Sequence, residues 1–240
     1  MFRSIQLALV LAFAIPAQVF AQAVDDAVSV DPDVHNVILD NEHFRVFDAR
    51  ASKGAKSPMH THPPMVLISL GKTRFHMTTP DGKATIFNLN PGEVRWVVDA
   101  RHSWEVLAGE LHAIGVEIKS AQKEGPPPPA PQRKENDSVS ADPEAHHLLF
   151  ENPHVRVFEG RTSHGRKSPM HSHPPTLLVS LDWIRLKLSL PDGKALIHDF
   201  SQGQVLWLAD GGEHSWEALA GSGRVIAVEV KSATAATAAK

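Results

Sequence analysis

One nine-residue stretch occurs twice in the chain with almost no change. It reads KSPMHTHPP at Lys56–Pro64 and KSPMHSHPP at Lys167–Pro175, so the two copies lie 111 residues apart. Both copies keep two histidines separated by a single residue. Successive side chains of a β-strand point to opposite faces, so histidines at positions i and i+2 face the same way. The stretch therefore predicts, in each half of the chain, a strand that presents two imidazoles together.

The duplication extends well beyond this stretch. DPDVHNVILDNEHFRVFDAR, from Asp31, matches DPEAHHLLFENPHVRVFEGR, from Asp142, and the similarity continues to VEIKSA and VEVKSA. One extra residue enters the second copy between Trp207 and His214. Because a repeat of about 90 residues can bury its own core, this pattern indicates two tandem domains rather than a solenoid.

Each copy consists of short runs rich in Val, Ile, Phe, Trp and Thr. Examples are FRVFDAR, MVLISL, TRFHMTT, ATIFNL and HAIGVEIK, which are separated by turn sequences such as SKG, PDGK and NPGE. No helical period competes with these runs. Short strands between Gly, Pro and Asp turns predict an all-β fold, with an antiparallel sandwich or barrel in each half.

The remaining segments surround the two copies. Arg3 precedes an apolar run from Leu7 to Ile15 and then small residues, a pattern typical of a secretory signal peptide. The run is too short to span a bilayer, which takes about 20 helical residues, so we expect a periplasmic or secreted protein without membrane contact after cleavage. The sequence predicts a signal peptide at 1–23, a first domain at 24–121, a proline-rich linker at 122–141, a second domain at 142–233 and a flexible tail at 234–240.

Four consecutive prolines in the predicted linker favour an extended, semi-rigid spacer. A proline-rich run can also be a ligand for an aromatic groove of another protein, which leaves a second interpretation open.

The overall composition excludes several classes of function. A net charge of −3 with neutral histidines provides no basic surface for nucleic acid. The chain contains no cysteine and no tyrosine, which excludes disulfides, thiolate ligands and tyrosyl chemistry. Fifteen histidines are the abundant source of metal ligands.

A third histidine recurs farther along each copy. His102 in RHSWE corresponds to His214 in EHSWE. A histidine pair on one strand together with a distant third histidine is typical of a metal site. The sequence thus predicts one metal site in each half, with the ligands His60, His62, His102, His171, His173 and His214.

Other histidines recur or stand alone. The pairs His35/His146 and His43/His154 also recur, and we expect the second of these pairs to pack or hydrogen bond at the start of a strand. No counterpart exists for His76, His112, His147, His164 and His198, which we do not expect to be ligands.

The spacing of glycines and histidines resembles the cupin superfamily. Gly54 and Gly165 precede an H-x-H pair by five intervening residues, and PGEVRWVVDARH and QGQVLWLADGGEH are similar to the second cupin motif. The resemblance covers roughly residues 31–233 and implies a bicupin, with two double-stranded β-helix domains of the jelly-roll class. It assigns the third-ligand role to His102 and His214, and it implies homo-oligomers paired through sheet edges.

The chain departs from this family at one ligand position. The glutamate expected four residues after the second histidine is replaced by Val66 and Leu177, which strand parity predicts to face inward as an apolar wall. This departure argues against the manganese chemistry of oxalate oxidase and oxalate decarboxylase. The sites are similar to those of three-histidine cupins such as cysteine dioxygenase, whose tyrosine this chain lacks, and diketone-cleaving dioxygenase. Ferrous iron is thus the favoured divalent metal, with Zn, Cu, Ni and Mn as alternatives.

Strand parity also indicates which residues surround the predicted metal. Trp104 and Trp216 lie two residues after the third histidine and should share its face, as part of the pocket or of the core. Lysine and arginine could bind a substrate carboxylate or form salt bridges at the surface. The pocket candidates are Arg45, Lys56, Val66, Trp104, Arg156, Lys167, Leu177 and Trp216.

No catalytic residue is assigned from the sequence. Glu117 and Glu229 could orient a ligand or act as a general base if the last strand directs them inward. The copies differ near the third histidine, where Arg101 is replaced by Gly and Glu213, so we expect different ligand preferences.

These observations predict an exported metal-binding bicupin. It could be a dioxygenase that acts on a small organic acid or a diketone-like substrate. A non-enzymatic ligand- or metal-binding protein and a non-oxidative lyase or isomerase remain the alternatives.

Overall fold

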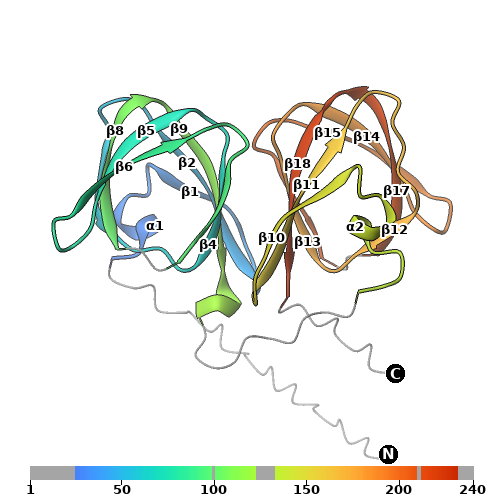
Figure 1. Cartoon of the computed structure of the whole chain (residues 1–240), viewed down its shortest axis with the longest axis horizontal. Coiled ribbons are helices and arrows are strands. Elements are labelled where there is room, and N and C mark those ends of the chain that lie inside the picture. The colour runs from blue at the N-terminus through green and yellow to red at the C-terminus, as the bar shows by residue number, and fades with distance from the viewer. Residues whose placement is uncertain (1–24, 99–100, 123–132, 210–211, 232–240) are drawn as a thin grey trace, which may run out of the picture.

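The computed structural model describes residues 25–98, 101–122, 133–209 and 212–231, which fold almost entirely into β-strands. The strands form two barrels that lie side by side, one from each copy of the repeat (Figure 1). The expected all-β fold with two tandem jelly-roll domains is confirmed. The predicted signal peptide and C-terminal tail lie outside the described residues.

The first barrel and its flanking turns contain α1 (Ala27–Val30), β1 (His35–Asp40), β2 (Phe44–Ala51), β3 (Lys56–His60), β4 (Met65–Ser69), β5 (Thr73–Thr78), β6 (Ala84–Leu89), β7 (Val94–Val97), β8 (His102–Gly109), β9 (Leu111–Ile118) and η1 (Lys119–Gln122). The second contains α2 (Ser138–Ala141), β10 (His146–Glu151), β11 (Val155–Thr162), β12 (His171–His173), β13 (Thr176–Ser180), β14 (Ile184–Ser189), β15 (Ala195–Phe200), β16 (Val205–Leu208), β17 (Gly212–Gly221) and β18 (Gly223–Val230).

Each barrel pairs a five-stranded sheet with a four-stranded sheet. The orders are β1-β2-β9-β4-β7 and β3-β8-β5-β6 in the first barrel, and β10-β11-β18-β13-β16 and β12-β17-β14-β15 in the second. The named strands pair antiparallel, and the strand order is the same in both barrels. The duplication therefore preserves the complete topology.

Turn chemistry explains why the β5–β6 and β14–β15 hairpins close at equivalent places. The Pro-Asp-Gly-Lys sequence supplies Gly82 and Gly193, whose φ angles of 78° and 83° lie in the left-handed region that favours glycine. The aspartate of each turn accepts a hydrogen bond from the backbone N–H of the lysine, over 3.2 Å for Asp81 and 3.0 Å for Asp192.

The five-stranded sheets bury both of their faces. One face lines the barrel, and the other packs against the equivalent sheet of the second barrel to form a single hydrophobic core. Val46, Val116, Val157 and Val228 in this shared core are all 0% exposed. The two barrels are thus held together by apolar packing along their adjacent sheets.

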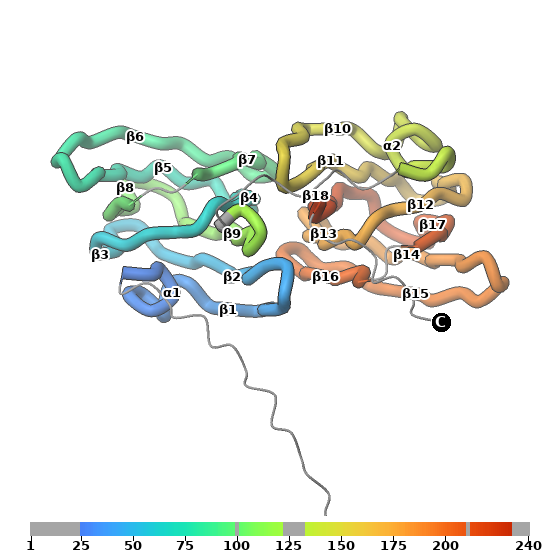
Figure 2. Tube along the Cα trace, turned by 90° about the horizontal axis from the view of Figure 1, so that it is seen from below, coloured from blue at the N-terminus to red at the C-terminus, as the bar shows by residue number. Residues whose placement is uncertain are grey.

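Reciprocal aromatic contacts flank this shared core. The His43 ring lies 5.6 Å from Trp207 of the other barrel, and the His154 ring stacks 6.2 Å from Trp96. Figure 2 shows the corresponding neighbours, with β7 beside β10 and the β1–β2 turn beside β16. The reciprocity means that the barrels are related by an approximate two-fold axis. It also gives His43 and His154 the packing role expected of them.

Part of the predicted linker differs from the expected spacer. Its proline run lies outside the described residues, but residues 138–141 form α2 and Asp137 forms a parallel bridge with Ser172. The same bridge joins Asp26 to Thr61 in the first barrel. The repeat thus begins before the aligned Asp31. None of the described helices is long and apolar enough to cross a membrane.

Candidate metal centre

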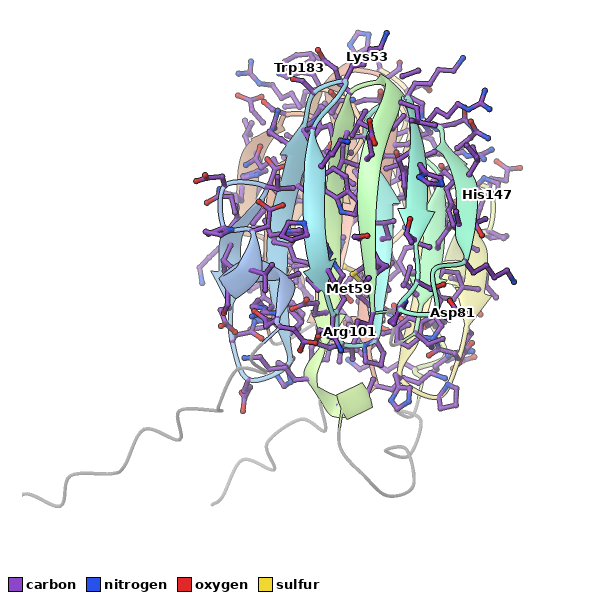
Figure 3. All side chains as sticks on the ribbon, turned by 90° about the vertical axis from the view of Figure 1, so that its left-hand side faces the viewer. Lys53, Met59, Asp81, Arg101, His147 and Trp183 are labelled. Carbon is purple, nitrogen blue, oxygen red and sulfur yellow. The ribbon has the colours of Figure 1, made fainter. Side chains whose placement is uncertain are left out.

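Four histidines of each barrel converge in its interior. In the first barrel His35 begins β1, His60 ends β3, His62 follows it, and His102 begins β8. Antiparallel pairing of β3 with β8 sets His60 directly opposite His102, as the pairing of β12 with β17 sets His171 opposite His214. In Figure 3 Met59 and Arg101, the sequence neighbours of two of these histidines, lie at the same end of the first barrel.

The ring separations in the first barrel are short enough for a common ion. Nitrogen atoms of His35, His60 and His62 lie within 4.8 Å of one another. The ring centre of His102 lies 4.7 Å from that of His60 and 5.6 Å from that of His62. The structure therefore brings together the three histidines expected from the sequence and adds His35.

The second barrel repeats this geometry. Nitrogen atoms of His146, His171 and His173 lie within 4.8 Å of one another. The His214 ring is centred 4.6 Å from His171 and 5.2 Å from His173. His146 thus has the same place as His35 in the first barrel.

Hydrogen bonds at Nδ1 fix which nitrogen faces the centre of the cluster. Nδ1 of His60 lies 2.8 Å from the carbonyl oxygen of Pro58, and Nδ1 of His35 lies 3.1 Å from that of Asp31. A carbonyl can only accept, so each Nδ1 carries the proton and donates it. The same contacts recur at His171 and His146. The lone pair of each of these imidazoles is therefore at Nε2.

The Nε2 atoms supply a direct test of whether these residues fit a metal. Nε2 of His60 and Nε2 of His171 are buried and have no hydrogen-bond partner among the described residues. A buried nitrogen of this kind is costly unless something binds it, and Nε2 is a preferred ligand atom of transition metals. Neutral nitrogen donors suit Zn, Cu, Ni and Fe. The donor set therefore fits a divalent transition metal in each barrel.

Burial keeps the cluster neutral. It lowers the pKa of His35 and of His60 to about 4, and that of His62 to about 3, from the ordinary value of 6.5. Burial likewise lowers the pKa of His146 and His171 to about 4 and that of His214 to about 3. Neighbouring imidazoles lower these pKa values further. At neutral pH these six rings are therefore in the form that binds metal.

A buried carboxylate orients one histidine in each barrel. Glu117 lies on the inward face of β9, and its carboxylate accepts from Nδ1 of His62 over 3.3 Å. Glu229 and His173 make the same contact over 3.3 Å. Carboxylates behind a ligand histidine fix its ring and raise its basicity. The last strand thus directs both glutamates inward, which was the condition for their expected role as orienting groups.

The arginines expected at the pocket have another role. Arg45 donates to Glu117 and Asp26, with Nε 2.5 Å from Glu117 Oε2 and Nη1 3.1 Å from Asp26 Oδ2. Although burial opposes its charge, these hydrogen bonds raise the pKa of Arg45. Arg156 makes the equivalent pairs with Glu229 and Asp137. Neither guanidinium is free for a substrate carboxylate, so the proposed anchoring role is wrong.

The lysines expected at the pocket lie outside the barrels. Lys56 pairs with Glu105 over 3.2 Å, and Lys167 pairs with Glu217 over 3.1 Å. The lysine side chains are 70% and 67% exposed, which shows that they face solvent. The register of β3 shifts between Ser57 and His60, so the alternation counted from the histidines does not reach Lys56. The predicted pocket role is therefore corrected.

The predicted apolar wall at Val66 and Leu177 is also corrected. Both side chains are 0% exposed, but they belong to the core between the barrels and not to the interior. Alternation from His62 fails because Pro63 and Pro64 separate it from β4, a break that resets the face. Leu67 and Leu178, one residue later, line the two interiors instead.

The tryptophans lie where parity predicted. Trp104 lines a cavity of about 380 Å³ in the first barrel, together with His35, His62 and His102. Trp216 lines a cavity of about 70 Å³ in the second barrel, beside its four histidines. Each cluster therefore borders an aromatic wall, but the adjoining space differs greatly in size.

One ligand candidate in each barrel was missed in the sequence. His35 and His146 recur between the two copies, which was the available signal, but neither belongs to an H-x-H pair. Their place in the cluster depends on the approach of β1 to β3 across the barrel. The spacing of residues along the chain does not predict this tertiary contact.

Several solved structures share this architecture. AerE from Microcystis aeruginosa is 13% identical over 82% of this chain and 97% of its own, with a TM-score of 0.52. A vicilin from Solanum melongena is 13% identical over 78% of this chain and 75% of its own, with a TM-score of 0.51. A point mutant of Bacillus subtilis oxalate decarboxylase is 14% identical over 85% of this chain and 71% of its own, with a TM-score of 0.50.

No protein-family model matches the sequence, and no curated protein sequence matches it. At such low identity the similarity of the solved structures concerns the fold alone.

Proposed function

We propose that this chain, which has a bicupin fold with a histidine cluster inside each barrel, is an exported protein that binds one divalent transition metal in each cluster. The first barrel is the active site of a metal-dependent dioxygenase in this proposal. The observation that carries the metal sites is the buried Nε2 of His60 and of His171, which no hydrogen bond satisfies within the described part of the chain. Ferrous iron is the proposed metal of the first barrel, with zinc, copper, nickel and manganese tested beside it.

The chemistry proposed for the first barrel follows from its ligand set and its lining. His35, His60, His62 and His102 would hold the ion, which supplies a Lewis-acidic and redox-active centre when bound. The four imidazoles are neutral, and negative charge near the ion comes from the carboxylates of Glu117 and Asp26, which share the single cation Arg45. The carboxylate of Glu117 acts from behind His62, because it fixes the Nδ1 proton and so directs Nε2 inward.

The lining favours oxidation over proton transfer. The described residues that line the first cavity include no aspartate and no glutamate. Burial raises the pKa of Glu117 despite the opposing hydrogen bond from Arg45, and this carboxylate is already paired with Arg45 and His62. A lyase or isomerase needs a group that takes up a proton at the substrate. The apolar wall instead offers water few hydrogen-bond partners, which suits an oxygen-dependent reaction.

Metal analysis tests the metal sites. Protein purified under reducing conditions and reconstituted with ferrous iron is expected to contain two ions per chain. The double variant His60→Ala with His171→Ala should contain none, while a double variant of the unmatched surface histidines, His76→Ala with His147→Ala, should keep both ions. Absence of bound metal in the reconstituted wild type would refute the proposed function.

Oxygen consumption tests the reaction class. We expect the iron-loaded protein to consume oxygen in step with loss of an organic substrate. Turnover that continues without oxygen, with zinc or nickel bound, would instead identify a lyase or isomerase. Stoichiometric binding without turnover would identify a binding protein.

Export is proposed from the N-terminal sequence alone. Expression of the full chain in a bacterial host with N-terminal sequencing of the periplasmic protein is expected to show cleavage near residue 23. Retention of the intact N-terminus in the cytoplasm would contradict export.

A further inference from the structure

The two interiors differ although the two clusters match. The cavity beside the first cluster has a volume of about 380 Å³, and that beside the second about 70 Å³. An apolar cavity of about 150 Å³ holds a benzene molecule, and ligand pockets start at about 300 Å³. Of the two interiors that the structure describes, only the first therefore has room for an organic molecule.

At three positions that line the first cavity, the second barrel has larger side chains. Thr73 pairs directly with Leu89 on β5 and β6, whereas the equivalent pair on β14 and β15 is Ile184 with Phe200. Val225 of β18 also replaces Ala113 of β9. Some lining residues are smaller in the second barrel, such as Leu186 in place of Phe75, but they do not restore the space.

The second interior is a packed hydrophobic core. Ile184, Phe200 and Trp216 form a buried cluster, with Leu178 and Leu206 packed against it. Side chains that fill an interior in this way leave room only for groups of the size of water or an ion. The cavity beside the second cluster is therefore too small for an organic molecule.

The residue at the opening of the first cavity is Arg95, which corresponds to Leu206 in the second barrel. Arg95 lines the cavity there, and the neighbouring Val98, also in the lining, is 61% exposed. The cavity thus reaches the surface beside Arg95. In the second barrel the equivalent Leu206 packs against the buried cluster and does not line the small cavity.

The first cavity is apolar away from the histidines. Phe75 and Phe87 stack with ring centres 5.6 Å apart, and Met77, Leu67 and Leu89 complete the lining near them. Such a wall favours an apolar body and penalises burial of a charge.

The charged side chain at the opening is already paired. Arg95 Nε donates to Glu93 over 2.7 Å, and Nη2 donates to the carbonyl of Asn88 over 3.1 Å. Arg45, which lies on the inward face of β2, is paired with Asp26 and Glu117. Among the described residues, neither arginine is available to neutralise an anionic ligand.

We propose that the first barrel alone binds an organic molecule, that this molecule is uncharged and largely apolar, and that the second barrel binds only its metal. The proposal rests on the proposed function. It adds that the substrate of the first site is uncharged and largely apolar, and that the second site binds no substrate. The molecule would place a hydroxyl or carbonyl oxygen toward the four histidines and its apolar body against Phe75 and Phe87. The second site then stabilises the fold without turnover.

Calorimetric titration of the metal-loaded protein with 2-naphthol tests the stoichiometry and the class of ligand. This probe is uncharged at pH 7, has the size of two fused rings and carries a single oxygen. We expect one binding site per chain. We further expect binding at least tenfold weaker for 6-hydroxy-2-naphthalenesulfonate, which adds a charge, and no binding for glycerol, which lacks the apolar body.

Reciprocal variants test the location. Leu89→Phe introduces the side chain of the second barrel into the first and should weaken 2-naphthol binding at least tenfold. The matched control Phe200→Leu alters the second barrel and should leave the affinity of the first site unchanged. If Leu89→Phe does not fold, the double variant Thr73→Ile with Ala113→Val tests the same space.

The metal content separates the two proposals. All of these variants should retain two ions per chain, because none of them alters a histidine. Two equivalent 2-naphthol sites, unchanged binding in Leu89→Phe, or tighter binding of the sulfonate would overturn the further inference while the metal sites stand. A chain that binds no metal would overturn the proposed function by itself.

Discussion

The two barrels have the same histidine cluster, but only the first has room beside it. His60, His62, Glu117 and Arg45 have counterparts in His171, His173, Glu229 and Arg156 with closely similar contacts. The space beside the cluster falls from about 380 Å³ to about 70 Å³. Ligand geometry and ligand space are therefore set by different residues. Backbone carbonyls and buried ion pairs fix the histidines, whereas the apolar side chains that line each interior determine the volume.

Loss of a ligand histidine is the strongest test of the similarity between the barrels. His60→Ala and His171→Ala should each remove one ion per chain and leave the other ion in place. Loss of affinity should exceed the roughly 10- to 100-fold effect of losing a residue that only orients a ligand. Metal analysis after dialysis measures this effect. Loss of both ions from one single variant would show that the two sites are not independent.

Acidification of the metal-free protein should destabilise both barrels. Burial lowers the pKa of His60 and of His171 to about 4, below the ordinary 6.5. Between these values the unfolded chain takes up protons that the folded chain does not, so stability is fully present above pH 6.5 and falls toward pH 4. A shift of this size corresponds to about 3 kcal/mol for one histidine.

Urea denaturation between pH 7 and pH 4 measures this loss. Metal-loaded protein should retain its stability to lower pH, because protons must then displace the ion. Equal stability of metal-free protein at pH 7 and pH 4.5 would contradict the neutral state of the buried histidines.

Removal of the buried arginine tests whether the networks behind the clusters are equivalent. Arg45→Met leaves the carboxylates of Asp26 and Glu117 buried without their cation, and Arg156→Met does the same to Asp137 and Glu229. Each change should destabilise the protein by about 3–5 kcal/mol. Chemical denaturation of the two variants provides the comparison. A neutral effect of either substitution would mean that its carboxylates become protonated or solvated at little cost.

Neutralisation of the orienting carboxylate should weaken metal binding without abolishing it. Glu117→Gln and Glu229→Gln keep the shape of the side chain but replace an ionic acceptor by an amide beside His62 or His173. We expect a decrease in metal affinity of about 10- to 100-fold at the altered site. Competition with a chelator measures it. Unchanged affinity would show that the histidine ring is held by packing alone.

The smallest effects are expected at the exposed lysines. Lys56→Ala and Lys167→Ala each remove a solvent-exposed salt bridge, to Glu105 or Glu217. Such pairs contribute less than about 1 kcal/mol, so stability and 2-naphthol affinity should hardly change. A marked loss of ligand binding in Lys56→Ala would show that this residue contributes to the pocket, contrary to its position at the surface.

The duplication, the strands and most of the cluster could be predicted from the amino-acid sequence. These features depend on local rules, because alternation within one strand sets His60 near His62 and turn residues fix where each hairpin closes. The third histidine followed from its recurrence beside a tryptophan in both copies. Trp104 was placed correctly because an unbroken strand joins it to His102.

The fourth histidine, the role of the arginines and the size of each interior depend on how the sheets meet in space. The alternation of side chains, counted from the histidines, does not hold across the register shift in β3, so Lys56 was assigned to the wrong face. It does not hold across Pro63–Pro64 either, so Val66 was also assigned to the wrong face. His35 meets His60 only because β1 approaches β3 across the barrel. Cavity volume depends on side chains from many strands. The effect on this volume of a difference such as Leu89 against Phe200 is therefore determined only in the folded barrel.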